Sequence, residues 1–175
     1  MSREKKSTIV LDLDNTLISS MEKLPLNANI DYSFYVHEPY FNNYFGYLRP
    51  HTHEFLTLLP SHFDQIIVWS AGTAKYVDNI CYYVFSQVGY IPHVILSRQD
   101  CVEVTTEKGK KYQKPLQKIF TEYYADPSKT YLLDDSKNSM ENNPESNCIL
   151  VKPFFGDRND SYLKDISIPW LFSLE

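Results

Sequence analysis

The stretch from Thr8 to Leu17 reads TIVLDLDNTL, an apolar run that ends in two carboxylates. A short apolar run bounded by polar, turn-forming residues predicts a buried β-strand. Because side chains alternate along a strand, Asp12 and Asp14 point to the same side if the extended geometry continues to Asp14. Ligands of open α/β sheets bind at the carboxyl ends of the strands. The stretch therefore predicts two crowded carboxylates at a ligand-binding edge.

Two carboxylates held this close repel each other unless a cation or a shared proton relieves the repulsion. Mg²⁺ is typically bound by one or two carboxylates together with the phosphate oxygens of a substrate. The pattern therefore indicates a Mg²⁺ site. The alternative is an ordinary strand end with two solvated acids.

Length and composition predict one globular domain over residues 1–175. Apolar residues make up 43% of the chain and aromatic residues 15%, which excludes a disordered polypeptide. The net charge of −5 argues against general nucleic-acid binding, although it leaves room for a local basic site. Residues 1–7 lack an apolar segment and are expected to form a flexible tail. With no apolar run of membrane-spanning length, we expect a soluble intracellular protein of the nucleus or cytoplasm, without membrane contact.

Apolar strands alternate with helical segments along the chain, which predicts an α/β fold: a mostly parallel sheet with helices on both faces. The predicted strands of this sheet are residues 8–13, 65–70, 93–97, 130–133 and 147–152. Helices are predicted at 53–59, 74–87, 114–124 and within 160–174. A hairpin is predicted at 101–113, around Gly109, and residues 18–48 form an aromatic-rich insert of short strands and turns.

Chemically active side chains follow three of these strands. Asp12 and Asp14 end the first, Ser70 follows the second, and Asp134 and Asp135 follow the strand at 130–133. Because right-handed crossovers bring the carboxyl ends of parallel strands to one edge, these residues are expected to converge there.

Several motifs carry a family resemblance. The sequence DLDNTL resembles the D-x-D-x-T signature of the haloacid dehalogenase superfamily, and VWSAGTAKY at 68–76 is similar to the second motif of the RNA polymerase II C-terminal-domain phosphatases, also called NLI-interacting-factor-like phosphatases. The match continues in order through 48–50, 97–101, 114–116, 132–136 and 149–163. The resemblance covers the chain from about Thr8 to Leu171 and implies a Rossmann-like haloacid dehalogenase core.

The resemblance assigns Asp12 as the nucleophile that forms an aspartyl-phosphate, a role that a carboxylate can fill chemically. Asp14 is assigned as general acid and then general base, with its backbone carbonyl on Mg²⁺. Asp12 and Asp135 are implied as direct Mg²⁺ ligands, and Asp134 as a support through water or Lys114.

A phosphate-binding group is implied at Ser70, Ala71 and Lys114. The Ser70 hydroxyl and nearby backbone N–H groups suit phosphate oxygens, and the Lys114 charge suits the nucleophile and the transferring phosphoryl group. Thr16 would fix the loop and Arg98 would lie near the substrate phosphate. The alternatives are an N-cap for Ser70, a turn or helix cap for Thr16 and a structural salt bridge for Arg98. The neighbouring lysines, which include Lys108, Lys110 and Lys111, are interpreted as a solvated hairpin surface.

Only about fifty residues separate Asp14 from the second strand, which leaves no room for a large cap domain. An open rim suits a phosphate on a macromolecule, and the aromatic insert, with Tyr40 and Phe41, suits proline-rich peptides. The sequence therefore predicts a Mg²⁺-dependent protein serine/threonine phosphatase acting on phosphorylated Ser-Pro peptides. Two alternatives stay open: a small-molecule or nucleic-acid 3′-phosphatase, and a catalytically inactive phosphopeptide-binding module. For half of the aromatic residues, packing on a sheet face explains them equally well.

Overall fold

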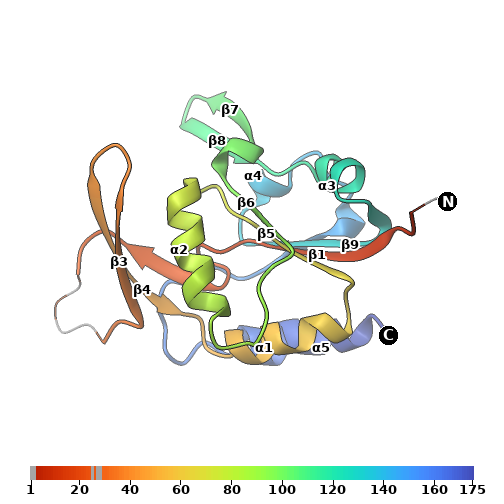
Figure 1. The fold of residues 1–175 in the computed structure, drawn as a ribbon, viewed down its shortest axis with the longest axis horizontal. Helices are drawn as coiled ribbons and strands as arrows, with labels where there is room; N and C mark the ends of the chain where they lie inside the picture. The colour runs from red at the N-terminus through yellow and green to blue at the C-terminus, as the bar shows by residue number, and fades with distance from the viewer. Residues whose placement is uncertain (1–2, 25, 27–28) are drawn as a thin grey trace.

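A computed structural model describes residues 3–24, 26 and 29–175; residues 1–2 of the predicted tail and 25, 27 and 28 of the predicted insert lie outside it (Figure 1). Its main sheet has the strand order β10-β9-β1-β5-β6, and every neighbouring pair is parallel. The strands are β1 (Lys6–Leu11), β5 (Gln65–Trp69), β6 (Val94–Leu96), β9 (Ala125–Asp134) and β10 (Cys148–Leu150). The predicted parallel α/β sheet is confirmed.

Alternation along β1 divides the core into two layers. Ile9 and Leu11 pack into a cluster with α1 (Thr52–Leu58), α2 (Ala74–Phe85) and α5 (Ile168–Ser173). Val10 faces the opposite side, where the cluster includes α3 (Leu116–Glu122) and α4 (Lys137–Met140). Figure 1 shows α1 and α5 below the sheet and α3 and α4 above it. Since both faces of each central strand are covered, these strands read as continuous apolar runs rather than as an alternating pattern.

The insert is more regular than predicted. Its strands β2 (Ile18–Met21), β3 (Tyr32–His37) and β4 (Phe41–Leu48) form a separate antiparallel sheet in the order β2-β4-β3. This insert sheet projects from one end of the molecule, at the left of Figure 1. Cross-strand pairing of aromatic and polar residues gives little periodic signal in the sequence, which is why the segment looked irregular.

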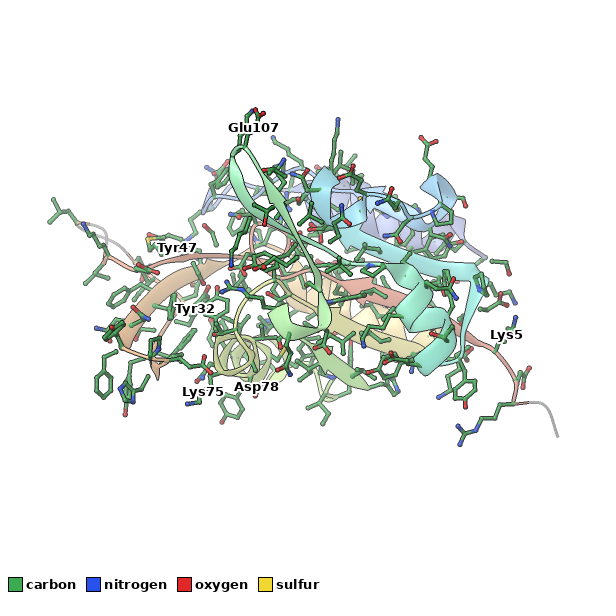
Figure 2. The ribbon with its side chains drawn as sticks, turned by 90° about the horizontal axis from the view of Figure 1, so that it is seen from above. Lys5, Tyr32, Tyr47, Lys75, Asp78 and Glu107 are labelled. Atoms are coloured by element: carbon green, nitrogen blue, oxygen red, sulfur yellow. The ribbon has the colours of Figure 1, made fainter. Side chains whose placement is uncertain are left out.

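A second extension is the hairpin of β7 (Val102–Thr106) and β8 (Gly109–Gln113), where Gly109 has a φ of +107° that favours glycine. The predicted hairpin is confirmed, and Figure 2 shows Glu107 at its free end. Short 3₁₀ turns occur at η1 (Leu59–Ser61), η2 (Arg98–Asp100) and η3 (Glu145–Asn147). A π-helical turn, η4 (Leu163–Ser167), precedes α5. No helix in the described part of the chain is long and apolar enough to cross a membrane.

The first strand differs from the prediction at both ends. It begins at Lys6, so the last residues of the predicted tail are part of the sheet. It ends at Leu11, because the chain then turns: the Leu13 carbonyl accepts hydrogen bonds from the amides of Thr16, Leu17 and Ile18. Asn15 lies in this turn with a φ of +62°, a conformation that asparagine tolerates better than most residues. The extended geometry therefore does not continue to Asp14.

Candidate active site

Three strand ends meet at the carboxyl edge of the main sheet. β1 lies between β5 and β9, so Asp12 is flanked by Ser70 on one side and by Asp134 and Asp135 on the other. The predicted convergence of these strand ends is confirmed.

Lys114 joins two of these acids. Its Nζ atom lies 2.8 Å from Asp12 Oδ1 and 2.6 Å from Asp134 Oδ2, and the side chain is buried. Burial alone would lower the pKa of Lys114, but the two carboxylates raise it above the ordinary value, so the ammonium stays charged. A fixed positive charge is thus buried beside the carboxylate of Asp12.

The acids around this charge form a compact group. Ligand oxygens of Asp12, Asp134 and Asp135 all lie within 4.8 Å of one another. Burial and then repulsion by Asp12 and Asp134 raise the pKa of Asp135 to about 7; burial and then repulsion by Asp12 raise that of Asp134 to about 6. One lysine does not neutralise three close carboxylates, so the donor set fits a hard divalent cation bound through oxygen.

The carboxylate of Asp14 lies outside this group, contrary to the expectation that it would crowd the same spot as Asp12. Its Oδ1 accepts a 2.5 Å hydrogen bond from the hydroxyl of Tyr76 on α2. Burial raises the pKa of Asp14 to about 6, although the bond from Tyr76 opposes the shift. The turn after Leu11 is the reason for the difference, since it directs the second carboxylate towards α2.

The turn that carries these acids is held from several directions. The Thr16 hydroxyl donates to Asp12 Oδ2 at 2.8 Å, so it orients the carboxylate directly rather than capping a helix. The Thr16 carbonyl accepts from Arg49 Nη1 at 3.0 Å, and Arg49 forms a bidentate pair with Asp160 at 2.8 and 3.0 Å. The Asn15 side chain donates to the carbonyl of Phe154. The sequence placed Arg49 in a motif but gave no hint that it was fully buried.

Ser70, Ala71 and Arg98 form the rim on the β5 side. The buried Ser70 hydroxyl accepts from the amide of Gly72 at 3.0 Å, and because α2 begins at Ala74 it is not the N-cap of that helix. The Ala71 carbonyl accepts from Arg98 Nε at 2.8 Å, and the Arg98 guanidinium stacks over Tyr112. Arg98 is thus held by a carbonyl and a ring, where a salt bridge had been the alternative.

Two adjoining hollows open at this edge, and Asp14 lines both. The acid hollow, of about 300 Å³, is lined by Asp12, Asp14, Asn15, Ala71, Lys110, Lys111, Tyr112, Lys114, Asp134, Asp135, Ser136, Asn138 and Ser139. The side hollow, of about 730 Å³, is lined by Asp14, Ser20, Met21, Glu22, Lys23, Tyr44, Ala71, Gly72, Thr73, Tyr76 and Arg98.

The sequence interpretation missed several lining residues. The sequence pattern indicates a solvated surface for Lys110 and Lys111, but both residues line the acid hollow. The Nζ atom of Lys111 donates to Asn138 Oδ1 at 3.2 Å. Their sequence position close before Lys114 was the only available signal. Tyr76 lay inside a recognised motif without an assigned role.

Tyr40 and Phe41 are placed elsewhere. They are 78% and 70% exposed, Tyr40 just before β4 and Phe41 at its first position, where the Phe41 ring stacks on His37 and lies tilted against Tyr35. Neither residue lines the two hollows described above. The insert reaches the site through other residues, Ser20 and Met21 of β2 and Tyr44 of β4.

The sequence and the fold of this chain are similar to those of known proteins. The sequence profile of the NLI interacting factor-like phosphatase family matches residues 7–174. A probable C-terminal domain small phosphatase of Dictyostelium discoideum is 32% identical over 163 residues, which cover 91% of this chain and 48% of that protein. The chain thus spans about half the length of this relative. A putative CTD phosphatase-like protein of Invertebrate iridescent virus 3 is 30% identical, with 92% of this chain and 91% of that protein covered.

Among solved structures, that of Fcp1, described as an essential RNA polymerase II CTD phosphatase, aligns with a TM-score of 0.66 and 22% identity. The alignment covers 97% of this chain and 49% of that one. At this identity the likeness shows a shared fold, which includes the parallel sheet described above.

Proposed function

This chain belongs to the NLI interacting factor-like phosphatase family, and we propose that it is a Mg²⁺-dependent protein serine/threonine phosphatase that works through an aspartyl-phosphate. The observation that carries the proposal is the buried contact of Lys114 with Asp12 and Asp134 at the carboxyl edge of the sheet. A nucleophilic carboxylate beside a fixed positive charge is what phosphoryl transfer requires.

Asp12 is the proposed nucleophile. Hydrogen bonds from Lys114 and Thr16 hold its two oxygens in one orientation, which favours a near-attack geometry. Attack on phosphorus would form the acyl phosphate of Asp12, the aspartyl-phosphate, as the bond from phosphorus to the serine or threonine oxygen breaks. The positive charge of Lys114 lowers the cost of bringing an anionic substrate against an anionic nucleophile.

Asp14 is the proposed general acid and base. Its raised pKa of about 6 keeps a fraction of the carboxyl groups protonated near neutral pH, as a general acid needs. The proton would pass to the leaving oxygen. The resulting carboxylate would then take a proton from the water that hydrolyses the aspartyl-phosphate at Asp12.

Asp12, Asp135 and the backbone carbonyl of Asp14 would hold Mg²⁺, with Asp134 supporting the site through Lys114. The chemistry of the donor set fits this ion, because the site gathers carboxylate oxygens, and burial together with repulsion by Asp12 and Asp134 raises the pKa of Asp135. When bound, Mg²⁺ supplies positive charge that offsets the charge of the transferring phosphoryl group.

The proposed substrates are phosphorylated Ser-Pro peptides such as those of the RNA polymerase II C-terminal domain. Two relatives are named as a probable C-terminal domain small phosphatase and a putative CTD phosphatase-like protein, and Fcp1 is described as an RNA polymerase II CTD phosphatase. The side hollow also supports a peptide substrate, since its lining combines Asp14 and Arg98 with insert residues such as Tyr44.

The test is phosphate release from a doubly phosphorylated Ser-Pro repeat peptide, measured with Mg²⁺ or with EDTA. Wild-type protein is expected to release phosphate only with Mg²⁺, and Asp12→Asn is expected to abolish release. Activity that survives Asp12→Asn excludes Asp12 as nucleophile. Tight peptide binding without hydrolysis by the wild type would identify a binding module, and preference for a nucleotide 3′-phosphate would identify the other alternative.

A further inference from the structure

Tyr76 is hydrogen-bonded to the carboxyl of Asp14. It is only 6% exposed, and its hydroxyl donates to Asp14 Oδ1 at 2.5 Å. Tyr76 lines the side hollow, whereas Asp14 lines both hollows. The hydrogen bond therefore joins Asp14 to a residue in the wall of the side hollow.

The ring of Tyr76 is fixed from two directions. A Cβ atom at Gly72 would lie 2.6 Å from Tyr76 Cδ1, so the turn after β5 leaves room for the ring only because residue 72 is glycine. On the other side the ring centroid lies 4.8 Å from that of Tyr44 and 5.8 Å from that of Phe34, both in the insert sheet. These contacts restrict where the hydroxyl can point.

The insert sheet also supplies polar support. Ser20 on β2 lines the side hollow together with Tyr76, and its hydroxyl forms a hydrogen bond with that of Tyr32 on β3. Tyr32 is held as closely as Tyr76, since a Cβ atom at Gly46 would lie 2.2 Å from the Tyr32 hydroxyl oxygen. The Tyr32 ring also contacts α2, because its centroid lies 4.9 Å from that of Tyr83.

We infer that Tyr76 is a positioning residue for proton transfer by Asp14. The bond from Tyr76 occupies Oδ1, which restrains rotation of the carboxyl and leaves the acid proton on Oδ2. As the Asp12 oxygen bonds to phosphorus, the electron pair of the breaking P–O bond stays on the serine oxygen, which takes the proton from Oδ2. This inference rests on the proposed function, because it assumes that Asp14 is the general acid.

The experiment compares leaving groups in wild type and Tyr76→Phe. An alkyl oxygen such as that of serine needs a proton as it leaves, whereas the stable nitrophenolate of p-nitrophenyl phosphate does not. The quantity kcat/KM reports steps up to departure of the leaving group. Tyr76→Phe is expected to lower kcat/KM about 10- to 100-fold for a phosphoserine peptide and less than about threefold for p-nitrophenyl phosphate, since a positioned general acid typically contributes about 10²–10⁴-fold.

The ratio of the two kcat/KM values, measured on one sample, is independent of how much of that sample is folded. Asp14→Asn gives the reference, because it should change this ratio at least as strongly. Tyr90→Phe is the matched control: the Tyr90 hydroxyl also donates a part-buried 2.5 Å bond, to the carbonyl of Leu56, and the ratio should not change.

An unchanged ratio in Tyr76→Phe, whether activity falls equally on both substrates or not at all, would overturn the inference. Failure of the proposed function looks different, because wild type would then fail to hydrolyse the phosphoserine peptide with Mg²⁺, whether or not it hydrolyses p-nitrophenyl phosphate.

Discussion

At the scale of single residues, the site depends on a balance of buried charge. Asp12, Lys114 and Asp134 are each at most 5% exposed and touch one another through hydrogen-bonded ion pairs. Buried charges of this kind are tolerated only while each has its partner, because desolvation of an unpaired ion costs several kcal/mol. Lys114 is the single cation between two acids, so both acids depend on it.

We therefore expect Lys114→Met to abolish activity and to lower the free energy of unfolding by about 3–5 kcal/mol without Mg²⁺, since it removes the shared partner of two buried carboxylates. Urea unfolding followed by circular dichroism measures the change. Lys118→Met is the control, because Lys118 pairs with Glu122 on the surface and its loss should change stability little. Equal stability of Lys114→Met and wild type would contradict this account.

The resemblance placed Asp12, Lys114, Asp134 and Asp135 in the site, with Lys114 near the nucleophile and Asp134 acting through water or Lys114. The sequence did not predict where the carboxylate of Asp14 would lie. Alternation along a strand indicated a common side for Asp12 and Asp14, and the turn at Asn15 separated them. A turn of this kind depends on hydrogen bonds to the Leu13 carbonyl, which no residue pattern specifies. The hydrogen bonds that join Asp14 to Tyr76 and Thr16 to Arg49 could not be predicted either, because these partners are distant in sequence.

At the scale of elements, the β7–β8 hairpin has a larger part in the site than its composition indicated. Local patterns predicted the hairpin itself, because Gly109 and two polar strands suffice to define it. They did not predict that Lys110 and Lys111 would line the acid hollow, because this depends on how the hairpin packs against α4. The hairpin therefore adds positive charge to the rim of a site whose floor is acidic.

Lys111→Ala is expected to raise KM for a doubly phosphorylated peptide roughly three- to tenfold with kcat changed less than about twofold, because an exposed rim charge attracts substrate without touching the reacting atoms. Steady-state kinetics at low and high salt measure the effect, which should shrink as salt screens the charge. Lys108→Ala, in the hairpin turn, is the control and should leave KM close to wild type. A fall in kcat with unchanged KM would instead place Lys111 in the chemistry.

At the scale of the whole molecule, the site lies at the carboxyl end of β1, the central strand of the main sheet. The alternation of strands and helices predicted this sheet and its edge, because buried parallel strands have a strong apolar signal. The insert sheet was predicted only as short strands and turns, since its cross-strand pairs, such as Tyr32 with Gly46, are set by close packing rather than by periodicity. The positions of Tyr40 and Phe41, away from the hollows, depend on this strand pairing and could not be predicted without it.

The acid group also sets how stability depends on pH. Asp135 and Asp134 have pKa values raised to about 7 and about 6 from an ordinary 3.8. Between the ordinary value and the raised values, the folded protein therefore binds more protons than the unfolded chain. Their contribution to stability is complete below about pH 4 and is lost as pH rises through 6 to 7.

Without Mg²⁺, the thermal midpoint is expected to fall by a few degrees between about pH 5.5 and pH 8, which calorimetry can measure. Adding Mg²⁺ at about pH 8 should restore it, because the ion replaces the protons. Asp135→Asn should flatten the pH dependence. A midpoint that rises over this range in wild type would argue against the raised pKa values.

The position of β1 in the middle of the sheet has a consequence for how the protein comes into being on the ribosome. Asp12 precedes β9, Lys114 and the Asp160 partner of Arg49 by more than a hundred residues along the chain. Pairing between segments so distant along the chain is slow and occurs late in folding. The nascent polypeptide therefore carries its proposed nucleophile long before the charges that would make it reactive, and the site is completed only after the segment up to Asp160 has been synthesised.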